Sequence, residues 1–142
     1  SYDIIRVIDK YKDHPAFRFY RNIPHDEFVN TMRHAIALIG NSSMGFQEAP
    51  YYNLPVVNIG NRQKGRLNAG NVEIVDYKVD KIIGAIEKAC FDQEYRAAVR
   101  KLENPYGDGN AAKRIKDTFE SIDVDDDKWY VKSKLCGENN LS

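Results

Sequence analysis

The sequence predicts an α/β fold, a Rossmann-like parallel sheet flanked by helices. Three short apolar runs predict the strands, and they cover residues 35–40 (AIALIG), 55–60 (PVVNIG) and 71–76 (NVEIVD). None of them alternates strictly between apolar and polar residues, which is typical of strands buried on both faces. Helical segments lie between and after these runs, and strands that alternate with helices indicate a parallel sheet covered on both sides.

In the first third of the chain, a helix is expected over residues 2–10, where isoleucines recur at helical spacing. The polar segment KDHP ends this pattern, because the residue before a proline resists the helical conformation. Residues 17–22 (FRFYRN) alternate aromatic with basic side chains and predict a half-buried strand. Pro24 and Asp26 then introduce a helix over residues 25–35.

Further helices are expected along the rest of the chain. Residues 45–53 are helical in part, and Pro50 makes this helix irregular or kinked near its start. The remaining predicted helices are 79–89, 92–102 and 111–122, and the turn-rich loop 104–110 (NPYGDGN) precedes the last of them.

The predicted domain spans residues 1–122. Residues 123–142 begin with an acidic run and end in polar residues, so they are interpreted as a tail, with a short helix over residues 126–135.

Composition excludes several classes of function. Lys plus Arg and Asp plus Glu both total 21 in 142 residues, so no net field attracts nucleic acid or an anionic membrane. Cys90 and Cys136 have no metal-binding spacing and are expected to be free thiols. No apolar stretch approaches the roughly 20 residues that span a bilayer, and no signal-peptide pattern begins the chain. We expect a cytoplasmic protein without a metal or other cofactor.

A candidate anion site follows the first of the three apolar runs. Residues 40–45 (GNSSMG) lie where a strand should lead into a helix, and ligands of parallel sheets bind at such strand ends. Ser42 and Ser43 offer hydroxyl and backbone N–H donors, and Gly45 carries no side chain that would hold a ligand away. The same residues also suit a plain helix N-cap, so this segment alone leaves both interpretations open.

A cationic segment follows the next apolar run. Arg62, Lys64 and Arg66 lie in NRQKGR, and together with GNSS they would form a clamp for a diphosphate. The alternative is a solvated basic turn. Glu48 lies one turn beyond GNSS, where its carboxylate could accept both hydroxyls of a ribose or simply favour the helix dipole.

The sequence offers a base-reading segment but no catalytic pair. Ile23 follows the predicted strand 17–22, where backbone groups could read the edge of a base, or form a plain loop. His14, His25 and His34 are not spaced as metal ligands, and no nucleophile lies beside a base in a recognisable pattern. The residues by themselves therefore indicate nucleotide or diphosphate binding without a reaction.

Several segments taken together resemble one family. GNSSMGFQEAPYYNLPVVNIGNRQKGR followed by NPYGDGNAAKRI is similar to the C-terminal part of UDP-N-acetylglucosamine 2-epimerases, over about residues 2–122. NIGNRQKGR is most similar to the hydrolysing branch, which releases UDP and N-acetylmannosamine for the synthesis of sialic-acid-type sugars.

The resemblance implies a fold and a set of roles. The fold is the C-terminal half of a GT-B architecture of two Rossmann-like domains. The C-terminal domain would hold most of the UDP part of UDP-N-acetylglucosamine, or UDP itself, with the sugar in the cleft between the domains. The implied contacts are the diphosphate for Ser42 and Ser43, the ribose for Glu48, the phosphate region for Arg62, and uracil for the backbone of Ile23. The family reaction removes the proton at C2 of the sugar and expels UDP, giving a 2-acetamidoglucal intermediate.

The resemblance also has departures. The family's catalytic carboxylates and its UDP-contacting histidine precede the matched region, so no catalytic residue is expected in this chain, and the chain is expected to be inactive alone. The expected partners are the N-terminal domain of the same enzyme and a further copy in a homo-oligomer. Two central strands of the family's sheet are also missing. The alternatives are a GT-B glycosyltransferase domain and a non-catalytic nucleotide-sugar-binding module.

Overall fold

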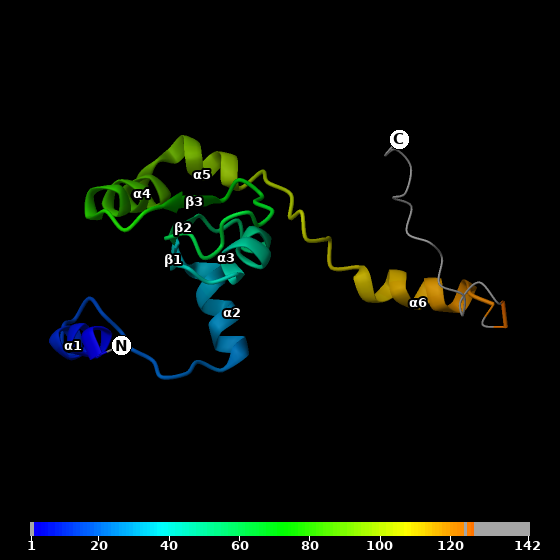
Figure 1. Cartoon of the computed structure of the whole chain (residues 1–142), viewed down its shortest axis with the longest axis horizontal. Coiled ribbons are helices and arrows are strands. Elements are labelled where there is room, and N and C mark those ends of the chain that lie inside the picture. Colours follow the sequence, from blue (N-terminus) through cyan, green and yellow to red (C-terminus); the bar gives the residue numbers. More distant parts are fainter. Residues whose placement is uncertain (1, 124, 127–142) are drawn as a thin grey trace, which may run out of the picture. The chain divides into compact units, whose positions relative to one another are not determined.

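The structure is a computed structural model that describes residues 2–123 and 125–126. The chain forms two compact units, residues 1–105 and 106–142 (Figure 1). The first unit contains α1 (Tyr2–Tyr11), α2 (His25–His34), β1 (Leu38–Gly40), α3 (Met44–Gln47), the 3-10 helix η1 (Ala49–Tyr52), β2 (Val56–Ile59), β3 (Val72–Val75), α4 (Val79–Phe91) and α5 (Gln93–Val99). The second unit contains α6 (Ala111–Ser121).

The sheet has the predicted parallel pairing. Its order is β1-β2-β3, and both neighbouring pairs run parallel. The register places Leu38 opposite Val56 and Val56 opposite Val72. Because all three strands run parallel, their carboxyl ends lie at one edge of the sheet, and the turns that follow β1 and β2 lie next to each other there.

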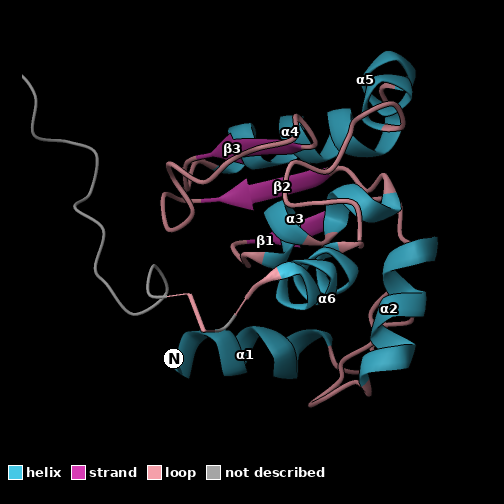
Figure 2. Ribbon diagram, turned by 90° about the vertical axis from the view of Figure 1, so that its right-hand side faces the viewer, coloured by secondary structure: helices cyan, strands magenta, loops and turns pink. Residues whose placement is uncertain are grey.

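Helices cover both faces of this sheet, as Figure 2 shows. On one face, Val56 and Val72 form a buried cluster with residues of α2, α3 and η1, among them Met32 and Phe46. On the opposite face, Val57 packs with Ala85 and other residues of α4. Adjacent residues of a strand point to opposite faces, so the continuous apolar run of β2 serves both layers. The predicted fold class, a Rossmann-like α/β domain, is confirmed.

The predicted strand over residues 17–22 is wrong. These residues form no strand and are exposed. The aromatic rings instead stack locally, with centroids 5.3 Å apart between Tyr11 and Phe17 and 6.1 Å apart between Phe17 and Phe19. Alternating aromatic and basic residues suit one face of a sheet, but a strand forms only where a neighbouring strand accepts its backbone hydrogen bonds. The three-stranded sheet described above includes no such neighbour.

The partly helical segment predicted over residues 45–53 is confirmed and is split in two. α3 ends at Gln47, and η1 begins at Ala49 with Pro50 in its first turn. Pro50 has no backbone N–H to continue an α-helical ladder, which explains the break. Asn53 closes η1 in the left-handed conformation at φ 51°, a conformation that asparagine tolerates better than most residues.

The second unit begins within the NPYGDGN loop and continues into α6. Asn110 is the N-cap residue of α6 but its side chain makes no capping bond. The Asp108 carboxylate instead accepts bonds of 2.8 and 3.0 Å from Arg114 and one of 3.0 Å from the backbone N–H of Asn110. These bonds hold the pKa of Asp108 well below its ordinary value. The predicted helix 126–135 lies, apart from residue 126, outside the described residues.

Three other sequence expectations concern thiols, metals and membranes. Cys90 is a free thiol, and Cys136 lies outside the described residues. Within residues 2–123 and 125–126, no group of His, Cys, Asp and Glu side chains is arranged to hold a metal ion. No helix in that part of the chain has the length and apolar character needed to cross a membrane.

Candidate functional site

The turns that follow β1 and β2 are joined by a side-chain hydrogen bond. Gln63 Nε2 donates to the backbone carbonyl oxygen of Asn41 over 2.9 Å. Gly40 and Asn58 are paired residues near the ends of the same two strands. The serine-containing turn and the cationic turn are therefore neighbours at the carboxyl edge of the sheet, where ligands of such folds bind.

Ser42 and Ser43 differ in how their hydroxyls are used. The Ser42 Oγ accepts a long bond of 3.4 Å from the backbone N–H of Met44. Ser43 is the N-cap residue of α3, but its side chain makes no capping bond. Helix capping thus uses the Ser42 hydroxyl only through one long hydrogen bond. It does not use the Ser43 hydroxyl, which is available to a ligand.

Gly45 has a packing role that the sequence did not reveal. It is buried, and a Cβ atom at this position would lie 2.8 Å from Cγ1 of Val56 on β2. Real Cβ atoms do not approach other atoms so closely, so α3 can lie against β2 only because residue 45 is glycine. The Cβ position faces Val56, so the structure gives this glycine a packing reason that is separate from the expected approach of a ligand.

Glu48 lies at the junction of α3 and η1. Its backbone N–H donates to the carbonyl oxygen of Met44 over 2.9 Å, and its own carbonyl oxygen accepts from Tyr51 over 2.9 Å. The residue is exposed, and among the described residues no cation lies within ion-pairing distance of its carboxylate. The backbone of Glu48 is thereby fixed while its carboxylate remains free to accept hydrogen bonds.

The cationic turn presents three exposed positive side chains, those of Arg62, Lys64 and Arg66. Two overlapping backbone bonds shape it, from Lys64 to Asn61 over 2.9 Å and from Arg66 to Gln63 over 3.2 Å. No described carboxylate pairs with any of the three cations. Uncompensated cations beside hydroxyl and backbone N–H donors can hold a phosphate or diphosphate.

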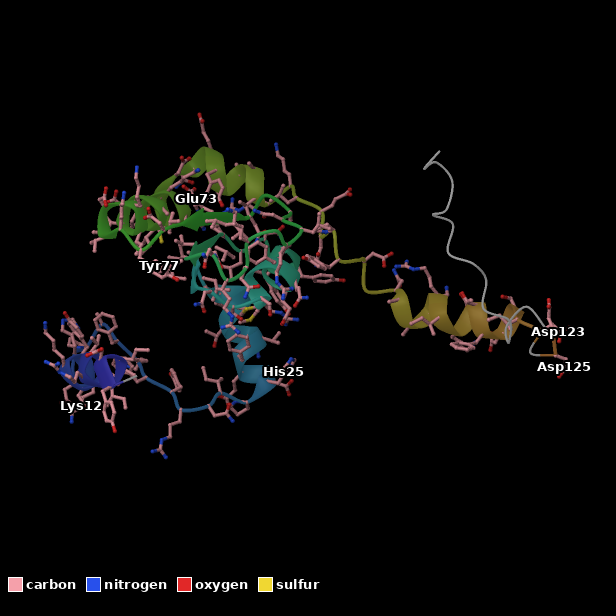
Figure 3. The ribbon with its side chains drawn as sticks, in the orientation of Figure 1. Lys12, His25, Glu73, Tyr77, Asp123 and Asp125 are labelled. Atoms are coloured by element: carbon pink, nitrogen blue, oxygen red, sulfur yellow. The ribbon has the colours of Figure 1, made fainter. Side chains whose placement is uncertain are left out.

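Ile23 and the three histidines are outside the two bonded turns, residues 40–45 and 61–66. Ile23 is half-buried and lies in the loop directly before α2. His25 begins α2 (Figure 3), and its Nδ1 lies 3.8 Å from the carboxylate of Asp26. His34 Nδ1 bonds the carbonyl oxygen of Asn30, one turn back on the same helix. These local contacts do not place Ile23 or the histidines in the two turns.

The sequence reasoning missed three buried amides, those of Asn58 on β2, Gln63 in the cationic turn and Asn71 directly before β3. Asn58, Gln63 and Asn71 are between 0% and 4% exposed, and each donates to a backbone carbonyl oxygen. A signal existed for two of them, because Asn58 and Asn71 lie in apolar runs where a polar residue needs a specific partner. Gln63 lies within the basic segment NRQKGR, where the sequence gives no signal that its side chain is buried.

A shallow pocket of about 470 Å³ lies at the carboxyl ends of β2 and β3. Its lining includes Asn61 and Lys64 of the cationic turn, together with Ile74, Asp76 and Tyr77. Of the side chains predicted to bind a nucleotide, Lys64 lines the pocket, and Ser42, Ser43, Glu48 and Arg62 do not. The pocket therefore adjoins the cationic turn and leaves out the hydroxyl-bearing turn.

Comparison with known proteins identifies the family. The model of the UDP-N-acetylglucosamine 2-epimerase family matches residues 3–120. A UDP-N,N'-diacetylbacillosamine 2-epimerase (hydrolyzing) from Legionella pneumophila is 34% identical over 119 residues, which are 84% of this chain and 30% of the relative. The polysialic acid biosynthesis protein P7 of Escherichia coli is 32% identical over 134 residues, which are 90% of this chain and 34% of the relative.

Solved structures show the same fold. A putative UDP-N-acetylglucosamine 2-epimerase from Listeria monocytogenes superimposes with a TM-score of 0.71 at 21% identity, over 83% of this chain and 32% of that chain. S. aureus MnaA, in a co-structure with UDP, gives a TM-score of 0.69 at 22% identity, over 84% of this chain and 33% of that chain. These likenesses confirm the predicted fold type, the GT-B-type fold of these enzymes, of which the chain spans about a third. Since one family model covers most of the sequence, the chain belongs to the UDP-N-acetylglucosamine 2-epimerase family.

Proposed function

We propose that residues 1–122 are the UDP-binding C-terminal part of a hydrolysing UDP-N-acetylglucosamine 2-epimerase. The observation that carries the proposal is the 2.9 Å bond from Gln63 to Asn41, because it brings the hydroxyl-rich turn and the cationic turn together. Relatives whose names include "hydrolyzing", such as the Legionella enzyme, support the choice of branch. The cytoplasm, where nucleotide sugars are made, is the proposed location.

The proposed contacts follow the order of groups in UDP. Ser42 and Ser43 bind the diphosphate with their hydroxyl and backbone N–H groups, and Arg62 neutralises its charge. Glu48 accepts hydrogen bonds from the ribose hydroxyls, for which its unpaired carboxylate is suited. Gly45 permits close approach of the ligand to the turn. The backbone of Ile23 reads uracil.

The proposed reaction has two steps. A base removes the proton at C2 of the sugar while the C1–O bond breaks and UDP leaves, which gives a 2-acetamidoglucal. Water then adds to this double bond, with a proton delivered to C2 on the opposite face, and the product is N-acetylmannosamine. This chain contributes stabilisation of the leaving diphosphate, and the acid and base belong to the N-terminal domain.

The chain alone is therefore proposed to bind UDP without turning over UDP-N-acetylglucosamine. It spans about a third of the length of its curated relatives. The acid and the base of the proposed reaction are not among its described residues in this proposal. Release of N-acetylmannosamine and UDP by the purified chain would refute this part of the proposal.

Titration calorimetry tests the site itself. UDP is titrated into the chain and into Arg62→Ala and Ser43→Ala, with Arg100→Ala as a control for loss of an exposed arginine outside the site. We expect UDP binding to weaken by roughly tenfold or more in Arg62→Ala, because hydrogen bonds between charged groups are worth about 1.5–3 kcal/mol. Arg100→Ala should bind as the parent does. Equal binding by all four proteins would remove the site assignment.

A further inference from the structure

We infer that Asn71 is a positioning residue for the ribose end of the nucleotide site. Its side-chain amide holds the segment Gly45–Leu54, which carries Glu48, in place against the sheet. The inference rests on the proposed function, since it assigns a purpose to the position of Glu48.

The Asn71 amide bonds both ends of this segment. Nδ2 donates to the carbonyl oxygen of Gly45 over 3.1 Å and to that of Leu54 over 3.2 Å. Glu48 lies between these two carbonyls, at the junction where α3 ends and η1 begins. One NH₂ group thus closes the segment into a loop whose ends cannot separate while both bonds persist.

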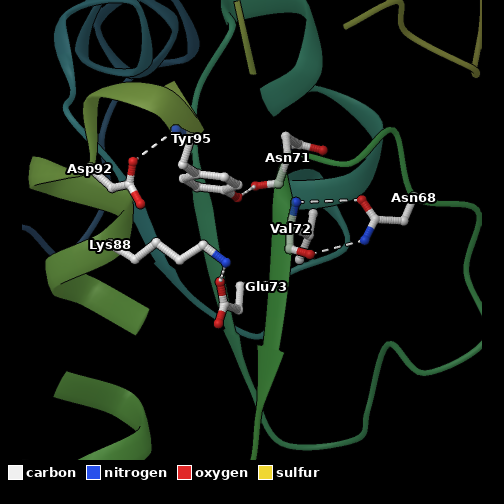
Figure 4. A network of polar contacts seen from close by, with 7 residues as sticks. All are labelled: Asn68, Asn71, Val72, Glu73, Lys88, Asp92 and Tyr95. Carbon is white, nitrogen blue, oxygen red and sulfur yellow. Dashed lines mark hydrogen bonds and ion pairs between the residues drawn. The ribbon is translucent and has the colours of Figure 1, made fainter. Parts of the chain in front are cut away.

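Asn71 is itself held by its backbone. Its carbonyl oxygen accepts from the Val56 N–H of β2 over 2.8 Å and from the Tyr95 hydroxyl over 2.9 Å. Figure 4 shows Tyr95 reaching this carbonyl oxygen from the helical side, with Asn68 bonded to Val72 on the other side. The backbone of Asn71 is therefore fixed by β2 and α5, and its side-chain amide fixes the segment Gly45–Leu54 relative to them.

The two contacts of the Asn71 side chain require a hydrogen-bond donor. Both partners of Nδ2 are carbonyl oxygens, so a carboxylate or an inverted amide would place an acceptor against two acceptors. The residue is fully buried, and no described group donates to its Oδ1. Because a buried acceptor without a partner disfavours the folded state, Oδ1 does not stabilise the fold. The useful part of the side chain is the pair of hydrogen bonds from Nδ2.

Ribose discrimination is the readout that a merely structural role would not change. Affinities for UDP and 2′-deoxy-UDP are measured by calorimetry on the full chain and on Asn71→Asp, Asn71→Ala, Glu48→Gln and Tyr95→Phe. We expect the parent to prefer UDP by roughly tenfold, the effect of one hydrogen bond to a charged group. Both Asn71 variants should reduce this preference to about threefold or less. Tyr95→Phe, which removes one of the two bonds to the Asn71 carbonyl oxygen and leaves both amide bonds, should reduce the preference less than either Asn71 variant does.

The outcomes separate this inference from the proposed function. If the parent shows no preference, or Glu48→Gln keeps it in full, the proposed ribose contact fails. If parent and Glu48→Gln behave as expected but a folded Asn71→Ala keeps the full preference, the role of Asn71 is overturned.

A second measurement applies even if both Asn71 variants fail to fold. In nuclear magnetic resonance spectra of the parent chain, UDP should shift the side-chain amide signals of Asn71 and leave those of Asn68 in place. Asn68 Nδ2 donates to the carbonyl oxygen of Val72 and serves as the internal control. Shifts of the Asn68 signals without shifts of the Asn71 signals would overturn the inference.

Discussion

The side chain of Gln63 donates a 2.9 Å hydrogen bond to the backbone of Asn41, although the two residues are 22 positions apart. The bond joins a turn of small and hydroxyl-bearing residues to a turn of three cations. Neither turn alone distinguishes an anion site from a solvated loop. The bond makes the two turns neighbours at the carboxyl edge of the sheet, and a diphosphate site needs donors and positive charges in one place.

Removing the Gln63 amide should loosen both turns together. We expect Gln63→Ala to lower the free energy of unfolding by about 1 kcal/mol, the net value of one hydrogen bond, and to weaken UDP binding several-fold because the two turns lose their fixed separation. Chemical denaturation and calorimetry measure these effects.

Gln93→Ala is the matched control for Gln63→Ala. Gln93 is exposed at the start of α5, so its replacement should change neither quantity. If Gln63→Ala binds UDP as tightly as Gln93→Ala does, the coupling of the two turns is unimportant for binding.

Two glycine-to-alanine changes should have opposite signs. Gly45→Ala would place Cβ 2.8 Å from Val56 Cγ1, and such overpacking costs about 1–3 kcal/mol of stability. Gly84 lies inside α4 with nothing within 4 Å of its built Cβ, so Gly84→Ala should stabilise by about 0.5–1 kcal/mol through higher helix propensity. Thermal and chemical denaturation of both variants provides the comparison.

Shortening Val56 tests the cause of the Gly45 effect. In the double variant Gly45→Ala, Val56→Ala, the added methyl group occupies space that the valine vacates, so the two changes should cost less together than the sum of their separate costs. Strict additivity would show that the loss in Gly45→Ala has another origin.

Ionisation of Tyr95 should weaken the fold at high pH. Burial, with a smaller contribution from the nearby Glu73 carboxylate, raises the pKa of Tyr95 from 10.0 to about 12. Because folding raises this pKa, the stability contributed by the neutral Tyr95 hydroxyl is complete below pH 10. It is lost as the pH rises from about 10 to about 12. The full rise in pKa corresponds to roughly 3 kcal/mol of unfolding free energy, and solvent screening at this partly buried side chain reduces that figure to about 1 kcal/mol.

Tyr95→Phe isolates this effect from the other tyrosines. Denaturant unfolding is measured for parent and variant below pH 10 and near pH 12. The parent should lose stability relative to the variant across this range. A constant difference between them would contradict the assignment to Tyr95.

The Asp108–Arg114 pair should control the start of α6 locally. Two bonds from Arg114, followed by the bond from Asn110, lower the pKa of Asp108 below its ordinary 3.8. The ionised Asp108 carboxylate therefore stabilises the helix start at pH values above its ordinary pKa. This stabilisation is lost as the pH falls through the lowered pKa of the folded state. Because both side chains are exposed to solvent, we expect fraying of the first turn of α6 without a change in global unfolding.

Backbone chemical shifts of α6 measure this fraying. Arg114→Gln should loosen the first turn at neutral pH, and acid should then have little further effect on it. Lys113→Gln removes a neighbouring exposed charge that pairs with no described carboxylate and should leave the turn intact. Equal effects of the two variants would show that general charge, and not the paired carboxylate, governs the helix start.

The sequence alone was sufficient for the layered α/β fold and for the family. Three apolar runs without alternation, separated by helical segments, predict buried parallel strands, and β1, β2 and β3 lie within them. Pro50 was sufficient to predict the break between α3 and η1. These features depend on local periodicity and on the covalent geometry of proline, which a single sequence displays directly.

The failed strand 17–22 marks the limit of such patterns. Alternation of aromatic and basic residues indicates which side chains could share a face, but a strand exists only when another strand accepts its hydrogen bonds. That partner is a property of the tertiary structure. In its absence the ring of Phe17 packs with that of Phe19 and with Tyr11 at the end of α1.

For the site, the sequence by itself determined which groups are available: the hydroxyls of Ser42 and Ser43, the carboxylate of Glu48 and the cations of the NRQKGR turn. Only the tertiary structure decided which backbone carbonyl oxygens the amides of Gln63 and Asn71 bond. The physical reason is that a buried amide acquires its role from the carbonyl oxygens that folding brings within reach, and those oxygens are distant in the sequence.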